Sequence, residues 1–281
     1  MRQGCLTSEH IEGCLALSQE AGWNQNESDW RFILSVGEGF GVWDDDGSLV
    51  ATTMTLTYGG RFSWICMVLV TASQRRQGLA TRLMQCAMDL LRKRRLIAGL
   101  DGTPTGREVY RLLGFRDVYP LTRMQAERSR YVMDPSTGSG VRSLPTRSLQ
   151  EIASYDAFAF GANRLSLLEN LYHRQPAMAH VAVRDDRIVG YVLGREGRLA
   201  TEIGPLGADD PATATALANA ALTVCSGPIF LDLPDHHQGL KDWLRRCGFE
   251  EQREFYRMLH GRGTPLDNPE RIFLIAGPEL G

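Results

Sequence analysis

The stretch "VTASQRRQGLA", residues 70–80, decides how the chain is interpreted. It follows an apolar run typical of a buried strand and leads into residues 78–95, where apolar residues recur at helical spacing. The first turn of a helix exposes unpaired backbone N–H groups and the positive end of the helix dipole. Gly78 removes a side chain there, and Arg75 and Arg76 add positive charge. This arrangement suits a phosphate or pyrophosphate group.

The same stretch matches neither of two common nucleotide-binding motifs. No Lys-Ser or Lys-Thr pair follows the glycine, as a P-loop requires, and the G-x-G-x-x-G pattern is absent. ATPase and dinucleotide-binding functions are therefore disfavoured. From the turn alone a simpler interpretation stays open, in which Gly78 only permits a tight connection and the arginines are solvated.

Composition and charge limit the class of protein. The chain has 281 residues, of which 43% are hydrophobic and 23% charged, as is usual for a globular protein with a core. Its net charge of -2 argues against a nucleic-acid partner. Without a long apolar run or a signal-peptide pattern, we expect a cytoplasmic protein that does not bind membranes. The six cysteines form no C-x-x-C pair, so we expect reduced thiols and no metal site. The oligomeric state stays open.

The chain repeats its own layout once. The segment "YRLLGFRDVYPLTRM" (110–124) resembles "LRRCGFEEQREFYRM" (244–258), with Gly-Phe and Arg-Met pairs at equal offsets. Upstream, residues 40–61 and 181–198 both follow the order strand, acidic turn, strand. A stretch rich in Ser, Pro, Gly and Thr, residues 133–148, is typical of a linker. We predict one domain type used twice, with domains 1–134 and 141–281 and a linker at 135–140.

The first half predicts a mixed order of helices and strands. The expected elements are helices at 7–22 and 28–36, strands at 40–44, 48–58 and 62–70, a helix at 78–95, a strand at 96–100, a helix at 103–114 and a last strand to 124. We therefore expect an α/β (α+β) fold in each half, with a mostly antiparallel sheet flanked by helices. The apolar C-terminal stretch 269–281 predicts a docked strand.

The stretch at 70–80 resembles motif A of the GNAT N-acetyltransferase superfamily, roughly V-x-P-x-x-R-[RQ]-x-G-x-[GA]. Ala72 stands where the pattern has proline, and the matching residues are Val70, Arg75, Arg76, Gly78 and Ala80. The segment "YRLLGF" (110–115) is similar to the family's Y-x-x-x-G-F segment. Together with the order of elements, the resemblance covers most of residues 7–124.

The resemblance implies acetyl-CoA as cosubstrate. Backbone amides near the start of the helix at 78–95 would bind its pyrophosphate. The strand at 62–70 would diverge from the strand at 96–100 and admit the pantetheine arm, with an N–H near Leu69 on the acetyl carbonyl. The implied cofactor-binding residues are Val68, Leu69, Val70, Arg75, Arg76, Gln77, Gly78, Leu79, Ala80, Thr81 and Thr103, the last standing where the family often has Asn.

Catalysis would rest on Tyr110 and on the backbone at Leu69. Tyr110 matches the family's tyrosine that protonates the departing thiolate, although an aromatic residue at this place in a helix also suits a core position. The strand at 62–70 carries no acidic residue to serve as general base, so water or a residue of the second half would take the amine proton. Cys66 is interpreted as a core residue rather than an acetyl carrier.

The second half has lost the residues that the first half uses. Residues 203–219 correspond to 68–82, but Asp209 and Asp210 replace the arginines, and Leu244 stands in place of Tyr110. Acidic side chains repel phosphate at close range. We therefore expect this half neither to bind CoA in the same way nor to donate a proton. It would be a structural cover for the first half or a contributor to the acceptor site.

The acceptor site is predicted from two regions. In this superfamily the segment equivalent to 21–30 contacts the acceptor, and polar and aromatic side chains in the second half could line a pocket. The candidate substrate-binding residues are Trp23, Asn24, Asp29, Tyr155, Asp156 and Asp232.

The sequence thus predicts an N-acetyltransferase that moves an acetyl group from acetyl-CoA to a primary amine by direct attack in a ternary complex. The acceptor would be a small molecule, and an amino acid, a polyamine, an amino sugar and an antibiotic all stay open. The alternative is a non-catalytic acetyl-CoA or CoA sensor or an interaction module.

Overall fold

The computed structural model of the protein describes residues 1–128 and 140–281. The first half confirms the predicted order of elements and adds β1, a four-residue strand too short and polar to be recognised from its pattern. Its elements are β1 (Arg2–Cys5), α1 (Ile11–Glu20), α2 (Glu27–Val36), β2 (Glu38–Trp43), β3 (Leu49–Tyr58), β4 (Phe62–Val70), α3 (Leu79–Lys93), β5 (Ile97–Gly102), α4 (Pro104–Leu112) and β6 (Phe115–Ala126).

The second half repeats this order. Its elements are β7 (Val141–Ser143), α5 (Leu149–Phe160), α6 (Leu165–Arg174), β8 (His180–Arg184), β9 (Arg187–Arg195), β10 (Thr201–Ala208), α7 (Pro211–Thr223), β11 (Ile229–Pro234), α8 (Gln238–Arg246), β12 (Glu250–His260) and β13 (Ile272–Leu274). The predicted duplication is therefore visible in the fold, with α3 and α4 of the first half matched by α7 and α8 of the second.

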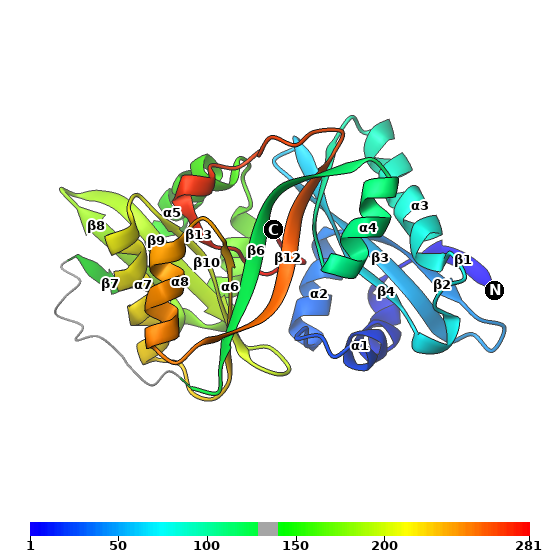
Figure 1. The fold of residues 1–281 in the computed structure, drawn as a ribbon, viewed down its shortest axis with the longest axis horizontal. Coiled ribbons are helices and arrows are strands. Elements are labelled where there is room, and N and C mark those ends of the chain that lie inside the picture. The colour runs from blue at the N-terminus through cyan, green and yellow to red at the C-terminus, as the bar shows by residue number, and fades with distance from the viewer. Residues whose placement is uncertain (129–139) are drawn as a thin grey trace.

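The strands of both halves form one continuous sheet (Figure 1). Its order is β1-β2-β3-β4-β5-β12-β6-β11-β10-β9-β8-β7, with β13 beside β10. Neighbours are mostly antiparallel, as predicted, and the pairs β4–β5 and β10–β11 are parallel. The halves exchange strands in the middle, because β12 lies between β5 and β6 while β6 also pairs with β11.

This exchange bears on the predicted domains. The boundary at 134 and most of the linker at 135–140 lie outside the described residues, so the division stays a prediction. The sheet itself continues from one half into the other.

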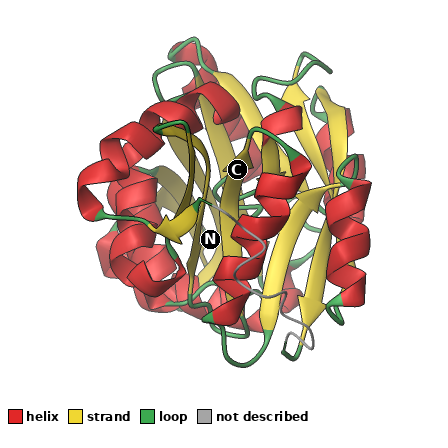
Figure 2. Cartoon of the chain, turned by 90° about the vertical axis from the view of Figure 1, so that its left-hand side faces the viewer, coloured by secondary structure: helices red, strands yellow, loops and turns green. Residues whose placement is uncertain are grey.

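Helices cover both faces of the sheet (Figure 2). The largest core is shared by the two halves and brings together buried side chains of α1, α2, α5, α6 and the last residues of the chain, among them Cys14, Trp30, Ile152, Leu168 and Leu280. Separate cores lie beneath α3 and beneath α7 and α8. The shared core and the exchanged strands hold the halves at a fixed spacing.

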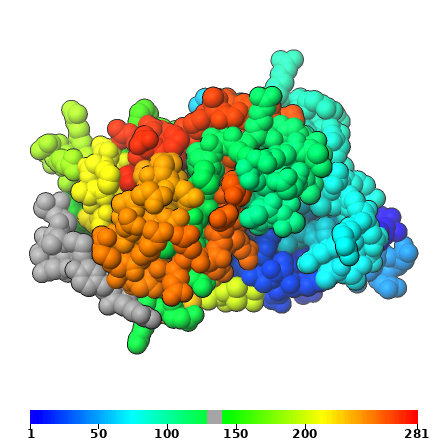
Figure 3. All heavy atoms as spheres, viewed as in Figure 1, coloured from blue at the N-terminus to red at the C-terminus, as the bar shows by residue number. Residues whose placement is uncertain are grey.

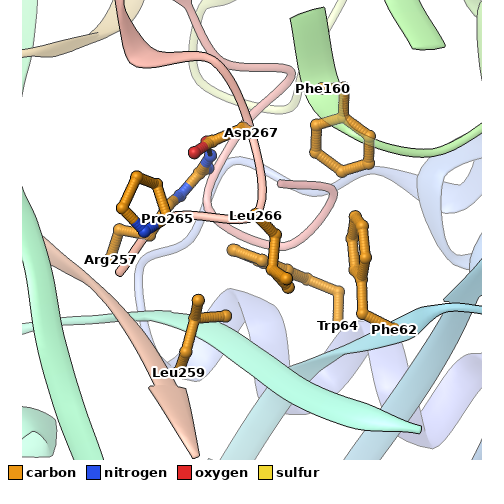
Figure 4. A pocket seen from close by; sticks show the side chains of 8 residues that line it. All are labelled: Phe62, Trp64, Phe160, Arg257, Leu259, Pro265, Leu266 and Asp267. Carbon is orange, nitrogen blue, oxygen red and sulfur yellow. Dashed lines mark hydrogen bonds and ion pairs between the residues drawn. The ribbon is translucent and has the colours of Figure 1, made fainter. Parts of the chain in front are cut away.

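Residues after β12 cover the seam between the halves (Figure 3). The N–H of Gly261 donates to the carbonyl of Gly114 across it. On the inner side, Arg257 of β12 forms ion pairs with Asp101 of β5 and with Asp267. Figure 4 shows that Arg257 and Asp267 border a space among apolar side chains, and at about 10 Å³ it is no larger than one water requires. This part of the seam is packed interior rather than a ligand site.

Candidate active site

The first parallel pair of strands opens at one end. Only residues Phe62–Trp64 of β4 pair with β5, where they lie opposite Ile97–Gly99. β4 then continues to Val70. Met67 has a φ of 51°, and the register of β4 against β3 shifts nearby, which marks a β-bulge. The Thr52 hydroxyl donates to the Met67 carbonyl at 2.8 Å and fixes this geometry. As a result, residues 65–70 all line a cavity.

The turn before α3 presents an uncapped helix N-terminus. Gly78 is the N-cap residue with a φ of 78°, and no side chain caps this helix. A Cβ atom added at Gly78 would meet nothing within 4 Å, so the space in front of the helix is open. Arg76 has a φ of 61°, and alternating left-handed residues of this kind turn successive N–H groups toward one side. Arg75 and Arg76 are exposed and form no ion pair within the described part of the chain.

Contacts with α1 and β4 hold this turn. The Glu20 carboxylate accepts from the N–H of Ala72 at 2.7 Å and from the hydroxyl of Thr71 at 3.1 Å. These two hydrogen bonds lower the pKa of Glu20. Arg75 donates from Nε to the Val70 carbonyl at 3.1 Å. The turn is thus ordered by the protein itself.

Tyr110 reaches the same cavity from α4. Thr103 caps this helix by accepting from the N–H of Gly106 at 3.2 Å. The Tyr110 ring lies against two glycines, since added Cβ atoms at Gly102 and Gly106 would come within 3.1 and 2.9 Å of it. Burial raises the pKa of Tyr110 to about 12, so the phenol is protonated at neutral pH. Its hydroxyl has no hydrogen-bond partner among the residues that the structure describes.

One cavity of about 480 Å³ joins these features and crosses from the first half into the second. Six of the predicted cofactor-binding residues line it: Val68, Leu69, Val70, Arg75, Ala80 and Thr103. The second half contributes Leu199, Phe230, Gln252, Arg253, Phe255, Pro278 and Glu279. The predicted residues Arg76, Gln77, Gly78, Leu79 and Thr81 lie in or directly after the turn but outside this lining.

The last residues of the chain bring Pro278 and Glu279 to the cavity. Tyr58 donates its hydroxyl to the Leu280 carbonyl at 2.8 Å, and Trp64 donates Nε1 to the Pro278 carbonyl at 3.0 Å. Arg164 donates to the Gly281 carbonyl at 2.6 Å. The segment is therefore fixed to both halves.

The preceding strand, β13, fills the opening in the second copy. It pairs with β10 through Leu206 and Leu274, and the N–H of Ile275 donates to the carbonyl of Asp232 in β11 at 3.0 Å. The prediction of a docked C-terminal strand is confirmed. β13 occupies the space between β10 and β11 that corresponds to the opening between β4 and β5.

In the second copy, a carboxylate of the protein itself lies at the N-terminus of the equivalent helix, α7. The Asp210 carboxylate caps α7 by accepting from the N–H of Thr213 at 2.8 Å and pairs with Arg184. Leu244, at the position of Tyr110, is fully buried. Both observations agree with the expectation that this half does not bind CoA as the first half does.

Sequence reasoning missed Asp101 and Arg123, which line the cavity from the first half, and both charged lining residues of the second half, Arg253 and Glu279. Glu279 is only 4% exposed and its carboxylate accepts a hydrogen bond from Arg195. Burial raises its pKa. No motif surrounds Arg253 or Glu279, and both are far from motif A in the sequence. Cys66 also lines the cavity, but burial raises its pKa well above the usual value, which keeps it a thiol and a weak nucleophile.

Two of the predicted acceptor residues line the cavity, Trp23 and Asn24. The Asn24 side chain is occupied, however. It donates to Glu202 at 3.1 Å and accepts from the N–H of Ala200 at 3.0 Å, so it attaches the loop after α1 to the second half.

The other four predicted acceptor residues do not line this cavity. They make structural contacts instead: Asp29 with Arg174 and Arg195, Tyr155 with Asp209, Asp156 with Arg164 and Tyr191, and Asp232 with Arg123. Polar composition suggested a pocket at these positions, whereas each side chain is engaged by a neighbouring residue, and Asp29, Asp156 and Asp232 are buried.

The residues that the structure describes contain neither a cluster of metal ligands nor a membrane-spanning helix. No set of three or more His, Cys, Asp or Glu side chains in them is arranged to hold a metal ion. No helix in the same residues is long and apolar enough to cross a membrane.

Comparisons with known proteins agree with the geometry. The Acetyltransferase (GNAT) family model matches residues 9–115, and the Acetyltransferase (GNAT) domain model matches residues 152–274. The chain is 24% identical over 275 residues to the uncharacterized N-acetyltransferase YitH of Bacillus subtilis, covering 96% of this chain and 95% of that protein. It is 28% identical over 253 residues to the holothin acyltransferase of a Pseudoalteromonas species, covering 89% and 84%.

The fold has a close counterpart among solved structures. A crystal structure from Pyrococcus horikoshii superposes with a TM-score of 0.81 at 19% identity and covers 100% of this chain and 95% of that one. At this identity the likeness establishes the fold alone.

Proposed function

Because the chain belongs to the GNAT N-acetyltransferase superfamily and carries two of its domains in tandem, we propose that it transfers the acetyl group of acetyl-CoA to the primary amine of a small molecule. One observation carries the proposal. The cavity of about 480 Å³ connects the opened end of β4 with Tyr110 and with side chains of the second half. Donor, proton donor and acceptor would therefore meet in one shared space.

The residues of the first half fit acetyl-CoA. The open space at Gly78, the uncapped N-terminus of α3 and the charges of Arg75 and Arg76, which form no ion pair with the described residues, suit its phosphate groups. The edge of β4 that β5 leaves unpaired beyond Trp64 would receive the pantetheine arm, with a backbone N–H near Leu69 offered to the acetyl group. In the second copy, Asp210 and β13 occupy the equivalent places, which supports one donor site per chain.

Three groups of this chain would carry the reaction. Acetyl-CoA supplies a thioester whose carbonyl carbon an amine can attack and whose thiolate can leave. A backbone N–H of β4 next to Leu69, on the edge that faces away from β3, would donate to the acetyl oxygen and stabilise the negative charge that develops there. The Tyr110 hydroxyl would give its proton to the sulfur as the C–S bond breaks. Glu279 would accept the proton that the amine loses as the C–N bond forms.

Glu279 is preferred to Asp101 for this last role. Both carboxylates line the cavity, but both oxygens of Asp101 accept hydrogen bonds from Arg257, at 3.1 and 2.9 Å. Burial raises the pKa of both carboxylates and so strengthens both as bases, and the choice therefore rests on hydrogen bonding. Arg195 donates to one oxygen of Glu279, Oε1.

Calorimetric titration with acetyl-CoA tests the donor site. We expect one site per chain in the wild type and a weakening of roughly 10- to 100-fold in Arg76→Glu, since charged hydrogen bonds contribute at about this level. Arg95→Glu is the matched control, because Arg95 also has a positive φ of 59° but lies at the opposite end of α3.

Two results would contradict the proposal. If Arg76→Glu leaves the affinity for acetyl-CoA unchanged, the donor binds elsewhere. Binding without turnover of any primary amine, with Tyr110 and Glu279 intact, would favour a non-catalytic sensor.

A further inference from the structure

The acceptor side of the cavity is built largely by the second half. Phe230, Phe255, Arg253 and Glu279 of the second half line the cavity. With CoA held by the first half, an amine would meet the acetyl group beside these residues. The exchange of β12 into the middle of the sheet brings Phe255 and Arg253 to this position.

Most charged side chains in the lining are neutralised by neighbours. Asp101 is paired with Arg257, and Glu279 is paired with Arg195. Arg123 is paired with Asp232 at 2.6 Å and with Glu202 at 3.1 Å. Arg75 lies in the turn before α3 and donates to the Val70 carbonyl.

Arg253 differs from these residues. It is half-buried in the lining, yet within the described ranges it has neither an ion pair nor a hydrogen bond. It also stands directly across from Arg123 in the β12–β6 pairing. Burial and the nearby positive charge of Arg123 lower the pKa of Arg253 by more than the negative charge of Asp232 raises it.

A local distortion of β12 directs this arginine. The register against β6 shifts between Glu251 and Arg253, so Gln252 is an extra residue on β12. In a regular strand neighbouring side chains point to opposite faces, whereas here Gln252 and Arg253 both line the cavity. Bulges of this kind are frequent beside active sites, where they redirect side chains.

From these contacts we infer that the acceptor amine also carries a carboxylate, which Arg253 binds at the second-half end of the cavity. The inference rests on the proposed acetyl transfer and narrows its acceptor. A guanidinium presents paired N–H donors that match a carboxylate, and the anion would compensate the charge of Arg253. The amine would lie toward Glu279. A polyamine would instead place additional positive charge beside an uncompensated arginine.

Matched acceptors test the inference. The assay follows CoA release from the full chain with ω-amino carboxylic acids of increasing length, with α-amino acids, with the primary amides of both, and with alkylamines and spermidine. We expect kcat/KM for the preferred carboxylate to exceed that of its amide by about 10-fold or more. Arg253→Gln should lower kcat/KM for the carboxylate by roughly 10- to 100-fold, mainly through KM, and change the amide less than about twofold. Arg253→Lys should restore part of the loss, and exposed Arg246→Gln is the control.

A second readout separates this inference from the proposed function. Binding of the same carboxylates to the CoA-loaded protein is measured by calorimetry for the wild type and Arg253→Gln. If no carboxylate reacts or binds in an Arg253-dependent manner, the inference is wrong. Acetylation of amides or spermidine in that case would leave the acetyl transfer standing and change only the acceptor class. Absence of acetyl-CoA binding would instead overturn the proposed function.

Discussion

The ring of Tyr110 lies against two backbone positions that carry no side chain. Any other residue at Gly106 would place a Cβ atom 2.9 Å from the ring, and at Gly102 the distance would be 3.1 Å. The two glycines therefore allow the phenol to enter the cavity from a helix. Its pKa of about 12 keeps the proton available over the whole physiological range.

Replacement of this tyrosine tests its role as the acid. In Tyr110→Phe we expect kcat to fall by about 100-fold or more, as for loss of a general acid, while the Kd for acetyl-CoA stays within about twofold. Wild-type kcat should show no decline from phenol ionisation up to about pH 10, because Tyr110 would lose its proton only near pH 12. Tyr256→Phe is the control, and a decline near pH 8 that disappears in Tyr110→Phe would contradict the assignment.

For Glu279 we expect the opposite dependence of kcat on pH, because a base acts only when it is deprotonated. Its raised pKa means that kcat should rise with pH through a value above that of an ordinary glutamate. In Glu279→Gln this rise should be absent and kcat lower by about 100-fold, with Glu254→Gln unaffected. Circular dichroism checks that the variant is folded, since Gln must replace a partner of the buried Arg195. An unchanged pH profile of kcat would assign the proton to water.

At the scale of elements, α3 and α7 occupy equivalent places but begin differently. α3 starts at Gly78 without a capping side chain, whereas Asp210 supplies α7 with its own carboxylate. β4 and β5 open toward a cavity, whereas β13 lies in the corresponding gap of the second copy. The duplicated fold thus leaves the opening of the first copy unfilled and closes that of the second with the chain itself.

Local patterns predicted these elements well for a physical reason. The apolar run of β4 and the helical spacing of α3 are set by neighbouring residues, so the turn at 75–81 and Tyr110 could be found from the sequence. The alternation of apolar and polar side chains along a strand does not determine which other strand lies beside it. The place of β12 between β5 and β6 was therefore not predictable, and neither were Arg253 and Glu279, which enter the cavity through long-range packing.

The whole molecule depends on those long-range pairings. β6 belongs to the first half by sequence, yet strands of the second half are hydrogen-bonded along both of its edges, β12 on one and β11 on the other. Separating the halves would break both ladders and expose the shared core that contains Trp30 and Leu280. The two halves should therefore behave as one cooperative unit.

A chain with a specific protease site inserted between residues 134 and 140 tests this unity. After cleavage, denaturing electrophoresis should show two fragments, while light scattering without denaturant should still give the same mass as for the uncut protein. Urea unfolding of the uncut protein should give coincident transitions by tryptophan fluorescence and by far-UV circular dichroism, as expected for one cooperative unit. Spontaneous separation of the cut fragments would show that each half completes its own sheet, and the shared cavity would then need another explanation. Persistence of the complex with its acetyl-CoA affinity intact would show that the exchanged strands, and not the connecting chain, hold the donor and acceptor sides together.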